Sequence, residues 1–313
     1  MAAPFGAKLL TRAKPGLLAA VPAVYAGLEG YRWVYSSEKD PAALCQSRLA
    51  SGLVTSAHVR DLEQHGFVVL EGRDAVMKDG VLAAARAEVS SFFSSGRFAR
   101  SVNGKSVRQD LVCWLRETDG TPGALDPDER HLKPLGPEML HCVRLLRGIT
   151  HELDLLGYST SHDHQVHQQL QLGFYPGDNQ SGYVRHLDHS DRSLFDLGLL
   201  GWIRAGERRK RTLTAILYLN DPAWSPSSVP RSASGAPGDG DGDGGELRCY
   251  HAACDSGQPG TQAFTDVVPT GGSLLIFDAR RIEHEVLSSS RDRFALTCWI
   301  TGTLGPGKDK SQT

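Results

Sequence analysis

The sequence predicts an α+β protein in which a core of short β-strands is braced by helices nearer the N-terminus. Apolar residues recur at helical spacing between residues 56 and 156, whereas short segments rich in β-branched and aromatic residues follow from Gln169 onward. Many short strands after a helical half are typical of a β-sandwich or barrel. The chain of 313 residues is long enough to bury such a core.

Capping residues and apolar spacing delimit the expected helices. Thr55 is an N-cap residue for the first helix, which Gly66 ends, and Gly157 ends the longest one. The helices are predicted over residues 56–65, 79–93 and 138–156. Among these helices we expect a strand over 67–70, a mobile Gly/Ser-rich loop over 94–106, and a strand over 107–115 that carries Trp114.

The C-terminal half is expected to hold a series of strands and two surface insertions. The strands are predicted over residues 169–175, 182–188, 212–219, 246–250, 265–268, 273–277, 284–288 and 293–301. The insertions cover about 189–209 and 225–245, the second rich in Pro, Ser, Gly and Asp. We therefore expect one domain over 51–303, with an N-terminal extension over 1–50 and a C-terminal tail over 304–313.

Composition narrows the partners and the compartment. The formal charge is −2, which does not suggest a nucleic-acid binder, and no apolar run reaches the length of a membrane span. The six cysteines form no Cys-x-x-Cys pair and fit free thiols of a reducing compartment, so an intracellular location in cytoplasm or nucleus is expected. Three basic residues before the first acid, Glu29, leave open whether residues 1–50 are an organelle-targeting segment or a tail.

The candidate metal ligands begin with two side chains on one expected strand. His186 and Asp188 are two residues apart, so they project from the same face of the strand over 182–188. His189 and Asp191 repeat the spacing, but in a polar, turn-like setting that favours solvated or more distant roles. His284 supplies a second imidazole, and two His with one carboxylate form the facial triad of non-haem Fe(II) oxygenases.

Arg293 is the candidate for binding a co-substrate. It follows His284 by nine residues and begins an otherwise apolar strand, where an unpaired charge is costly. Arginine binds a carboxylate through two parallel hydrogen bonds, so the distal carboxylate of 2-oxoglutarate is a fitting partner. The alternative interpretation is that Arg293 only marks the end of the strand.

This order of residues resembles the Fe(II)/2-oxoglutarate-dependent dioxygenases, and within them the prolyl hydroxylases that act on hypoxia-inducible factor and their microbial and lower-eukaryote relatives. The resemblance covers about residues 55–301. Beside the His, Asp and Arg pattern, it is carried by Val107-Arg108-Gln109-Asp110 with Trp114, Gly173-Phe174-Tyr175-Pro176-Gly177, Leu217-Tyr218-Leu219-Asn220, Gly244-Gly245-Glu246-Leu247-Arg248, Asp278-Ala279-Arg280-Arg281 and Arg293-Phe294-Ala295-Leu296-Thr297 with Trp299.

The resemblance implies a double-stranded β-helix (a jelly-roll, cupin-like core) and assigns roles at the metal and the co-substrate. The implied iron ligands are His186, Asp188 and His284. Arg293 would pair with the distal carboxylate of 2-oxoglutarate, helped by the hydroxyl of Tyr218, and Tyr175 would line the pocket near the metal. The alternative interpretation is that both tyrosines are ordinary strand aromatics.

For the substrate, the resemblance implies that Trp299 lies beside it and that Asp110 and Arg211 help to hold a loop, about 94–110, over it. Trp299 could equally be a strand aromatic, and Asp110 and Arg211 could be solvated charges. Arg211 also ends a basic run over 208–211, which fits either a solvated loop or an anchor for an acidic peptide.

The expected activity is hydroxylation of a prolyl residue in a peptide or protein, with 2-oxoglutarate and O₂ converted to succinate and CO₂. The expected cofactors are Fe(II), 2-oxoglutarate and, as reductant, L-ascorbate (vitamin C). Asp188 argues against a halogenase, in which halide takes the carboxylate position. The alternatives are the same chemistry on a small molecule or another side chain, and a non-catalytic metal-binding interaction module. The sequence leaves the oligomeric state open.

Two further polar segments favour loops over metal sites. Residues 161–167 contain three His and one Asp, which favours a solvated linker over a weak metal site because the whole run is polar. Residues 239–243 alternate Asp and Gly but lack the Glu and the helices of an EF-hand, so a flexible loop is expected.

Overall fold

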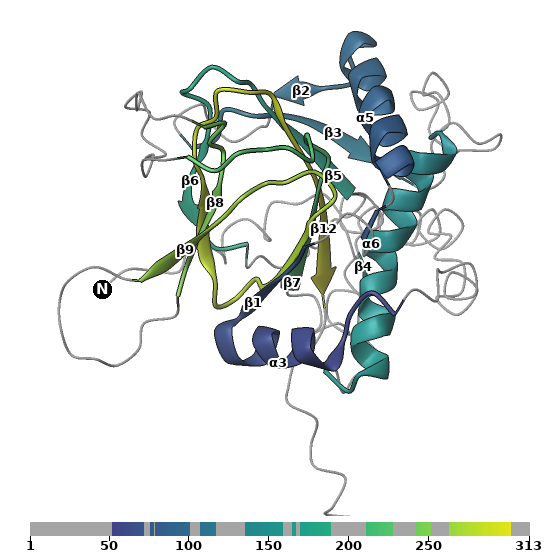
Figure 1. The fold of residues 1–313 in the computed structure, drawn as a ribbon, viewed down its shortest axis with the longest axis vertical. Coiled ribbons are helices and arrows are strands. Elements are labelled where there is room, and N and C mark those ends of the chain that lie inside the picture. Colours follow the sequence, from purple (N-terminus) through teal and green to yellow (C-terminus); the bar gives the residue numbers. More distant parts are fainter. Residues whose placement is uncertain are drawn as a thin grey trace, which may run out of the picture. The chain divides into compact units, whose positions relative to one another are not determined.

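Two β-sheets face each other, and helices lie along the outer side of the larger sheet (Figure 1). The computed structural model describes residues 52–71, 76–77, 79–100, 107–116, 135–158, 165–166, 170–188, 211–227, 242–251 and 263–301. All of these residues fall within one compact unit. The predicted extension over 1–50, the insertion over 189–209, most of the insertion over 225–245 and the tail over 304–313 lie outside the described residues.

Each of the three helices begins and ends close to its predicted position. They are α3 (Ser56–His65), α5 (Asp79–Ser94) and α6 (Pro137–Leu155). The Thr55 hydroxyl accepts the backbone N–H of His58, and the ring of His58 accepts the N–H of Thr55, so a histidine completes the capping box. Gly66 ends α3 with φ at 83°, a left-handed conformation that glycine adopts without strain.

The strand pairs of the larger sheet are all antiparallel, in the order β1-β10-β7-β12-β5-β3-β2, with β4 also paired to β12. Its strands are β1 (Phe67–Leu70), β2 (Ala99–Arg100), β3 (Leu111–Leu115), β4 (Gln165–Val166), β5 (Leu170–Tyr175), β7 (Arg211–Tyr218), β10 (Leu274–Asp278) and β12 (Arg293–Thr301). Because β12 lies at the centre, between β5 and β7, its side chains reach the middle of the sheet.

The smaller sheet has the order β6-β11-β8-β9. Its strands are β6 (Tyr183–His186), β8 (Leu247–Tyr250), β9 (Phe264–Val267) and β11 (Glu283–Val286). An isolated bridge between Arg108 and Tyr183 links the segment before β3 to β6. This bridge therefore connects the larger sheet to the smaller one near the first residue of β6.

Strand alternation divides the core into two layers. Leu213, Ala215 and Leu217 of β7 belong to an apolar cluster with residues of all three helices. Ile216 and Tyr218 face the other way and join a cluster with Leu247 and Val286 of the smaller sheet. The space between the two sheets is thus lined by every second residue of each strand.

The arrangement is consistent with the predicted jelly-roll core, and all eight strands predicted after Gln169 are present within two residues of their expected ends. The strand expected over 107–115 is shorter, at Leu111–Leu115. Gln165 and Val166 form the short β4, in a segment predicted to be a linker without regular structure. No helix among the described residues is long and apolar enough to cross a membrane.

Candidate active site

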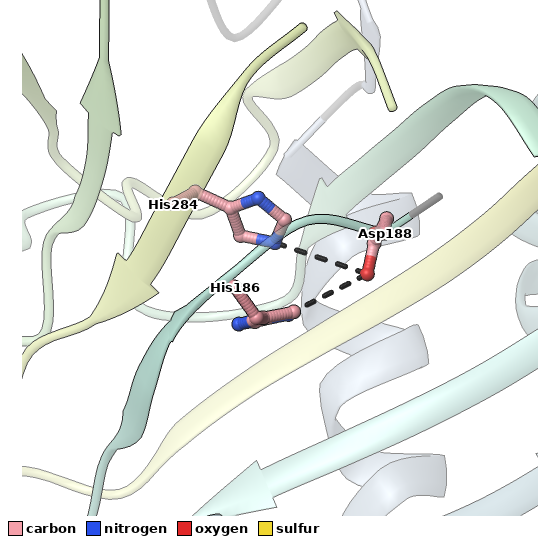
Figure 2. Close-up of side chains that lie close together, drawn as sticks. All are labelled: His186, Asp188 and His284. Atoms are coloured by element: carbon pink, nitrogen blue, oxygen red, sulfur yellow. Dashed lines mark ion pairs between the residues drawn. The ribbon is translucent and has the colours of Figure 1, made fainter. Parts of the chain in front are cut away.

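Two strands of the smaller sheet bring the three predicted metal ligands together. His186, the last residue of β6, is the register partner of His284 on β11, so the two rings lie side by side on one face. Asp188 follows His186 by two residues, and its carboxylate lies beside the same two rings. Its Oδ1 lies 3.5 Å from Nε2 of His186 and 3.9 Å from Nε2 of His284 (Figure 2). One ligand atom from each residue lies within 4.8 Å of the others.

Backbone carbonyls orient both imidazoles. Nδ1 of His186 lies 2.8 Å from the carbonyl oxygen of Val184, and Nδ1 of His284 lies 3.2 Å from that of Ile282. A carbonyl only accepts hydrogen bonds, so each Nδ1 carries a proton, and Nε2 is the ring atom of each histidine that faces Asp188 and could bind a metal. Burial lowers the pKa of His284 to about 4, so this ring is neutral at pH 7, as a metal ligand must be.

Two hydrogen-bond donors bind the oxygen of the Asp188 carboxylate that faces away from the imidazoles. Its Oδ2 accepts the Thr214 hydroxyl at 2.8 Å and the indole N–H of Trp299 at 3.0 Å, which turns Oδ1 toward the imidazoles. Burial alone would raise the pKa of Asp188, but the interactions with His186, His284 and Thr214 hold it well below its usual range. Two imidazoles and one ionised carboxylate fit the ligand set of Fe(II) on one face.

A cavity of about 430 Å³ extends from these ligands between the two sheets. Arg293 lies at its buried end with 1% of its surface exposed, and its Nε donates to the carbonyl oxygen of Gly245 at 2.8 Å. Gly245 has φ at 74°, and a Cβ there would lie 3.1 Å from Cδ of Arg293, so glycine permits this close approach. No described carboxylate forms an ion pair with Arg293, although a buried cation needs a counter-charge.

Two tyrosines flank that guanidinium. The ring centres of Tyr175 and Tyr218 lie 5.1 and 5.2 Å from Cζ of Arg293. The buried hydroxyl of Tyr218 has no hydrogen-bond partner among the described residues, and burial raises the pKa of Tyr218 to about 12, so the phenol keeps its proton. Tyr175 lines the cavity, whereas Tyr218 lies behind the lining residues. A guanidinium that pairs with no described carboxylate, beside a phenol hydroxyl, fits the distal carboxylate of 2-oxoglutarate.

The three residues expected near the substrate have different surroundings. Trp299 and Arg211 both line the cavity, with Cζ of Arg211 4.1 Å from the centre of the Trp299 ring. Asp110 is 2% exposed, so it is not a solvated charge. Arg108 donates to both carboxylate oxygens of Asp110, from Nε at 2.7 Å and from Nη2 at 2.5 Å. The pairing of Asp110 is therefore with Arg108, which lies two residues before it.

Sequence reasoning missed two residues that the structure brings to this site. Arg108 lines the cavity, and its presence in the motif that contains Asp110 was the available signal. Thr214 gave no signal, because its role depends on lying opposite Trp299 in the β7–β12 pair. Among the described residues, the three predicted ligands are the only group of at least three His, Cys, Asp or Glu placed to bind a metal.

Residues 170–301 match the model of the 2OG-Fe(II) oxygenase superfamily. This segment contains the three candidate ligands, Arg293 and both tyrosines. The predicted resemblance to the 2-oxoglutarate- and iron-dependent oxygenases is therefore confirmed for this segment.

Solved structures with a similar fold include three prolyl hydroxylases. One is a prolyl-4-hydroxylase of Pseudomonas putida, at 23% identity and a TM-score of 0.48, covering 79% of this chain and 98% of that one. A prolyl hydroxylase of Trichoplax adhaerens, solved with a peptide fragment of the hypoxia-inducible factor oxygen degradation domain, has 19% identity and a TM-score of 0.51, covering 80% and 90%. A prolyl 4-hydroxylase of Phytophthora capsici has 20% identity and a TM-score of 0.49, covering 88% and 70%. At 19% identity the likeness to the Trichoplax enzyme concerns the fold alone.

Proposed function

We propose that this protein is an Fe(II)- and 2-oxoglutarate-dependent dioxygenase that hydroxylates a prolyl residue in a peptide or protein. One observation carries the proposal. A His, Asp and His cluster and a buried arginine that pairs with no carboxylate among the described residues border the same cavity. A bound Fe(II) would supply the redox chemistry that couples decarboxylation of 2-oxoglutarate to succinate and CO₂ with transfer of oxygen to the substrate.

The chain's own residues bind and orient the reactants in this mechanism. His186, Asp188 and His284 would hold the metal and leave its other face open. Arg293 and the Tyr218 hydroxyl would bind the distal carboxylate of 2-oxoglutarate. This interaction fixes how far the 2-oxo acid end reaches toward the metal. Specificity for a five-carbon diacid would follow from that distance.

Apolar side chains form the walls between these two ends. Ile216, Leu247, Val286 and Ala295 line the cavity and come from both sheets. Such walls would exclude water from the bound metal and 2-oxoglutarate, and so would direct the oxidation to the bound substrate.

A peptide substrate is supported by an open, aromatic mouth. Trp114 lines the cavity with 41% of its surface exposed, and its ring centre lies 5.9 Å from that of Trp299. Exposed indole faces are suited to contact a proline ring. The Trichoplax enzyme of similar fold was solved with a peptide, which is in line with this proposal. The alternatives are the same chemistry on a small molecule or another side chain, and a metal-binding interaction module without turnover.

The decisive experiment measures succinate from 2-oxoglutarate with Fe(II) and L-ascorbate, which we expect to act as reductant. Turnover without added substrate, absent in Asp188→Ala, supports the enzyme. Tight metal binding with no turnover would favour the interaction module. A proline-containing peptide whose mass rises by one oxygen atom supports prolyl hydroxylation, and turnover that only a small molecule stimulates would contradict it.

We also propose an intracellular location in cytoplasm or nucleus, with targeting by residues 1–50 as the alternative. The four cysteines that the structure describes are buried and form no disulfide bond; they are Cys113, Cys142, Cys249 and Cys298. Free thiols of this kind are typical of a reducing compartment. Fluorescence microscopy of the tagged chain, with and without residues 1–50, tests this location.

A further inference from the structure

The guanidinium of Arg293 has a backbone contact that fixes its plane. The side chain is buried, and its Nε donates to the carbonyl oxygen of Gly245 over 2.8 Å. Because a guanidinium is planar, a hydrogen bond at Nε sets the direction in which its two terminal nitrogens point. Those two nitrogens are the pair left to bind a carboxylate. The direction of the Gly245 carbonyl therefore decides how Arg293 is aimed into the cavity.

That carbonyl belongs to a dipeptide with little conformational preference of its own. Gly244 and Gly245 are consecutive glycines, with φ at 70° and 74°. Glycine adopts positive and negative φ about equally well, so the backbone alone does not hold these peptide groups in one orientation. Contacts with the rest of the fold must therefore fix the direction of the Gly245 carbonyl.

The peptide group between the two glycines is held at both of its polar atoms. Its oxygen, the carbonyl of Gly244, accepts the indole N–H of Trp224 over 2.7 Å. Its N–H, on Gly245, donates to the carbonyl oxygen of Ser288 over 3.0 Å. Two opposed hydrogen bonds leave a planar peptide group little freedom to rotate. The bond from Trp224 comes from a side chain, so a substitution can remove it.

Trp224 is itself fixed in place. The side chain is buried, and its backbone N–H donates to the carbonyl oxygen of Asp221 over 3.1 Å, in the turn that follows β7. The carboxylate of Asp221 accepts the N–H of Ala223 in the same turn, over 2.9 Å. Trp224 does not line the cavity that contains the candidate ligands and Arg293. Any effect of Trp224 on a bound co-substrate must therefore pass through the two glycines.

We propose that Trp224 is a positioning residue for 2-oxoglutarate, which acts through the two glycines on Arg293. Its indole N–H fixes the first peptide group, the next carbonyl then points at Nε, and the guanidinium plane is set for the distal carboxylate. Trp224 and Gly244 lie at opposite ends of the predicted insertion over 225–245, so the hydrogen bond also joins the two ends of that segment. This inference rests on the proposed function, since it takes Arg293 to bind 2-oxoglutarate.

The test is Trp224→Phe, which keeps an aromatic ring and removes the N–H. Equilibrium dialysis of 2-oxoglutarate against the Fe(II)-loaded protein, without O₂, gives the dissociation constant. We expect this constant to rise about threefold to tenfold, as for a weakened hydrogen bond to a charged group. The affinity for Fe(II) should stay the same, because Trp224 lies outside the cavity. An unchanged dissociation constant for 2-oxoglutarate would overturn the proposal.

Selectivity between diacids separates positioning from a general loss of stability. The unsubstituted chain should bind 2-oxoglutarate more tightly than 2-oxoadipate, which is one methylene longer, because a fixed guanidinium fits one length. In Trp224→Phe a less constrained guanidinium should accept both diacids, so the ratio of their dissociation constants should fall about threefold. If both constants rise and their ratio stays the same, the substitution only destabilises the fold and the proposal is wrong.

Tyr250→Phe is the matched control. Tyr250 is the last residue of β8 and lies outside the cavity, and its hydroxyl donates to Glu285 over 2.7 Å. The substitution also removes one hydrogen bond from an aromatic side chain, and it should leave both dissociation constants unchanged. A rise equal to that of Trp224→Phe would contradict the proposal.

A closer replacement covers the case in which thermal unfolding shows that Trp224→Phe does not fold. Benzothienylalanine at position 224 keeps the bicyclic shape and has sulfur in place of the N–H. We expect the same rise in the dissociation constant of 2-oxoglutarate, and an unchanged constant would overturn the proposal.

Turnover separates this inference from the proposed function. If 2-oxoglutarate binds with the expected dependence on Trp224 but succinate never forms, the positioning role holds and the enzymatic proposal fails. If succinate forms but Trp224→Phe binds 2-oxoglutarate as the unsubstituted chain does, the enzymatic proposal holds and the positioning role is wrong. No binding of 2-oxoglutarate by the unsubstituted chain would overturn both.

Discussion

The indole N–H of Trp299 donates to Oδ2 of Asp188 over 3.0 Å, so a residue expected to touch substrate also holds a candidate metal ligand. Trp299 lies opposite Thr214 in the β7–β12 pair, and Thr214 donates to the same oxygen. The register of two central strands therefore sets the orientation of the carboxylate. Because Arg211 lies over the Trp299 ring, the same side chain joins the mouth of the cavity to its metal end.

Removing either donor should weaken metal binding. Trp299→Phe and Thr214→Val each delete one hydrogen bond to Asp188, and loss of such outer contacts usually lowers metal affinity about 10- to 100-fold. Anaerobic titration with Fe(II) measures this change. Thr212→Val is the matched control, since the Thr212 hydroxyl donates to the carbonyl oxygen of Ile300 instead. Equal metal affinity in all three variants would show that the two donors do not position the carboxylate.

The two His-x-Asp pairs offer a direct comparison of neighbouring carboxylates. Asp188→Ala should abolish Fe(II) binding and succinate formation, because it removes one of three ligands. Asp191→Ala should keep both, since the sequence favours a solvated role for the second pair. Metal content and succinate yield are the measurements. Loss of both in Asp191→Ala, with retention in Asp188→Ala, would move the site to the second pair.

The sequence predicted most of the fold because its strands have alternating side chains that face either the helices or the smaller sheet. The sequence did not predict β2 and β4, because each has only two residues. Such short strands are defined by backbone pairing alone and show no alternating pattern of side chains. It found His186 and Asp188 because a spacing of two on a strand is local information. Thr214 could not be found in the same way, since its relation to Asp188 depends on how distant strands pair.

Arg293 should control the requirement for 2-oxoglutarate. Arg293→Ala removes the only buried cation at that end of the described cavity, so we expect the KM for 2-oxoglutarate to rise at least tenfold, with a smaller rise for Arg293→Lys, which keeps the charge without the planar fork. Arg291→Ala is the control, because Arg291 is exposed and pairs with Asp221 and Asp243. An unchanged KM in Arg293→Ala would refute this assignment.

Tyr218→Phe should also raise the KM for 2-oxoglutarate, but by less than Arg293→Ala. The substitution removes only the hydroxyl that has no partner among the described residues, so the fold should be unaffected or slightly stabilised. We expect the KM for 2-oxoglutarate to rise about three- to tenfold, as for one lost hydrogen bond to a charged group. Steady-state succinate assays give the KM, and thermal unfolding serves as the control for stability. A lower KM would exclude a role for this hydroxyl in binding the carboxylate.

The stability of the metal-free protein should fall as the pH is lowered from about 6.5 to about 4. Burial lowers the pKa of His284 from 6.5 to about 4, so over this range the unfolded chain binds a proton that the folded chain does not. The contribution of the neutral His284 ring to the free energy of unfolding is therefore fully present above pH 6.5 and is lost as the pH approaches 4. This difference in pKa between the unfolded and the folded chain corresponds to a loss of about 3 kcal/mol at most in the free energy of unfolding. The depressed pKa of Asp188 acts only at lower pH, below its usual value of 3.8.

Denaturant unfolding of the metal-free protein at several pH values measures this dependence. His284→Gln should flatten the slope between pH 4 and 6.5, whatever its effect on overall stability, because the substituted residue does not titrate. His65→Gln, at the exposed end of α3, should keep the slope of the unsubstituted chain. If His284→Gln keeps the full slope, then protonation of the buried imidazole is not what destabilises the metal-free site in acid.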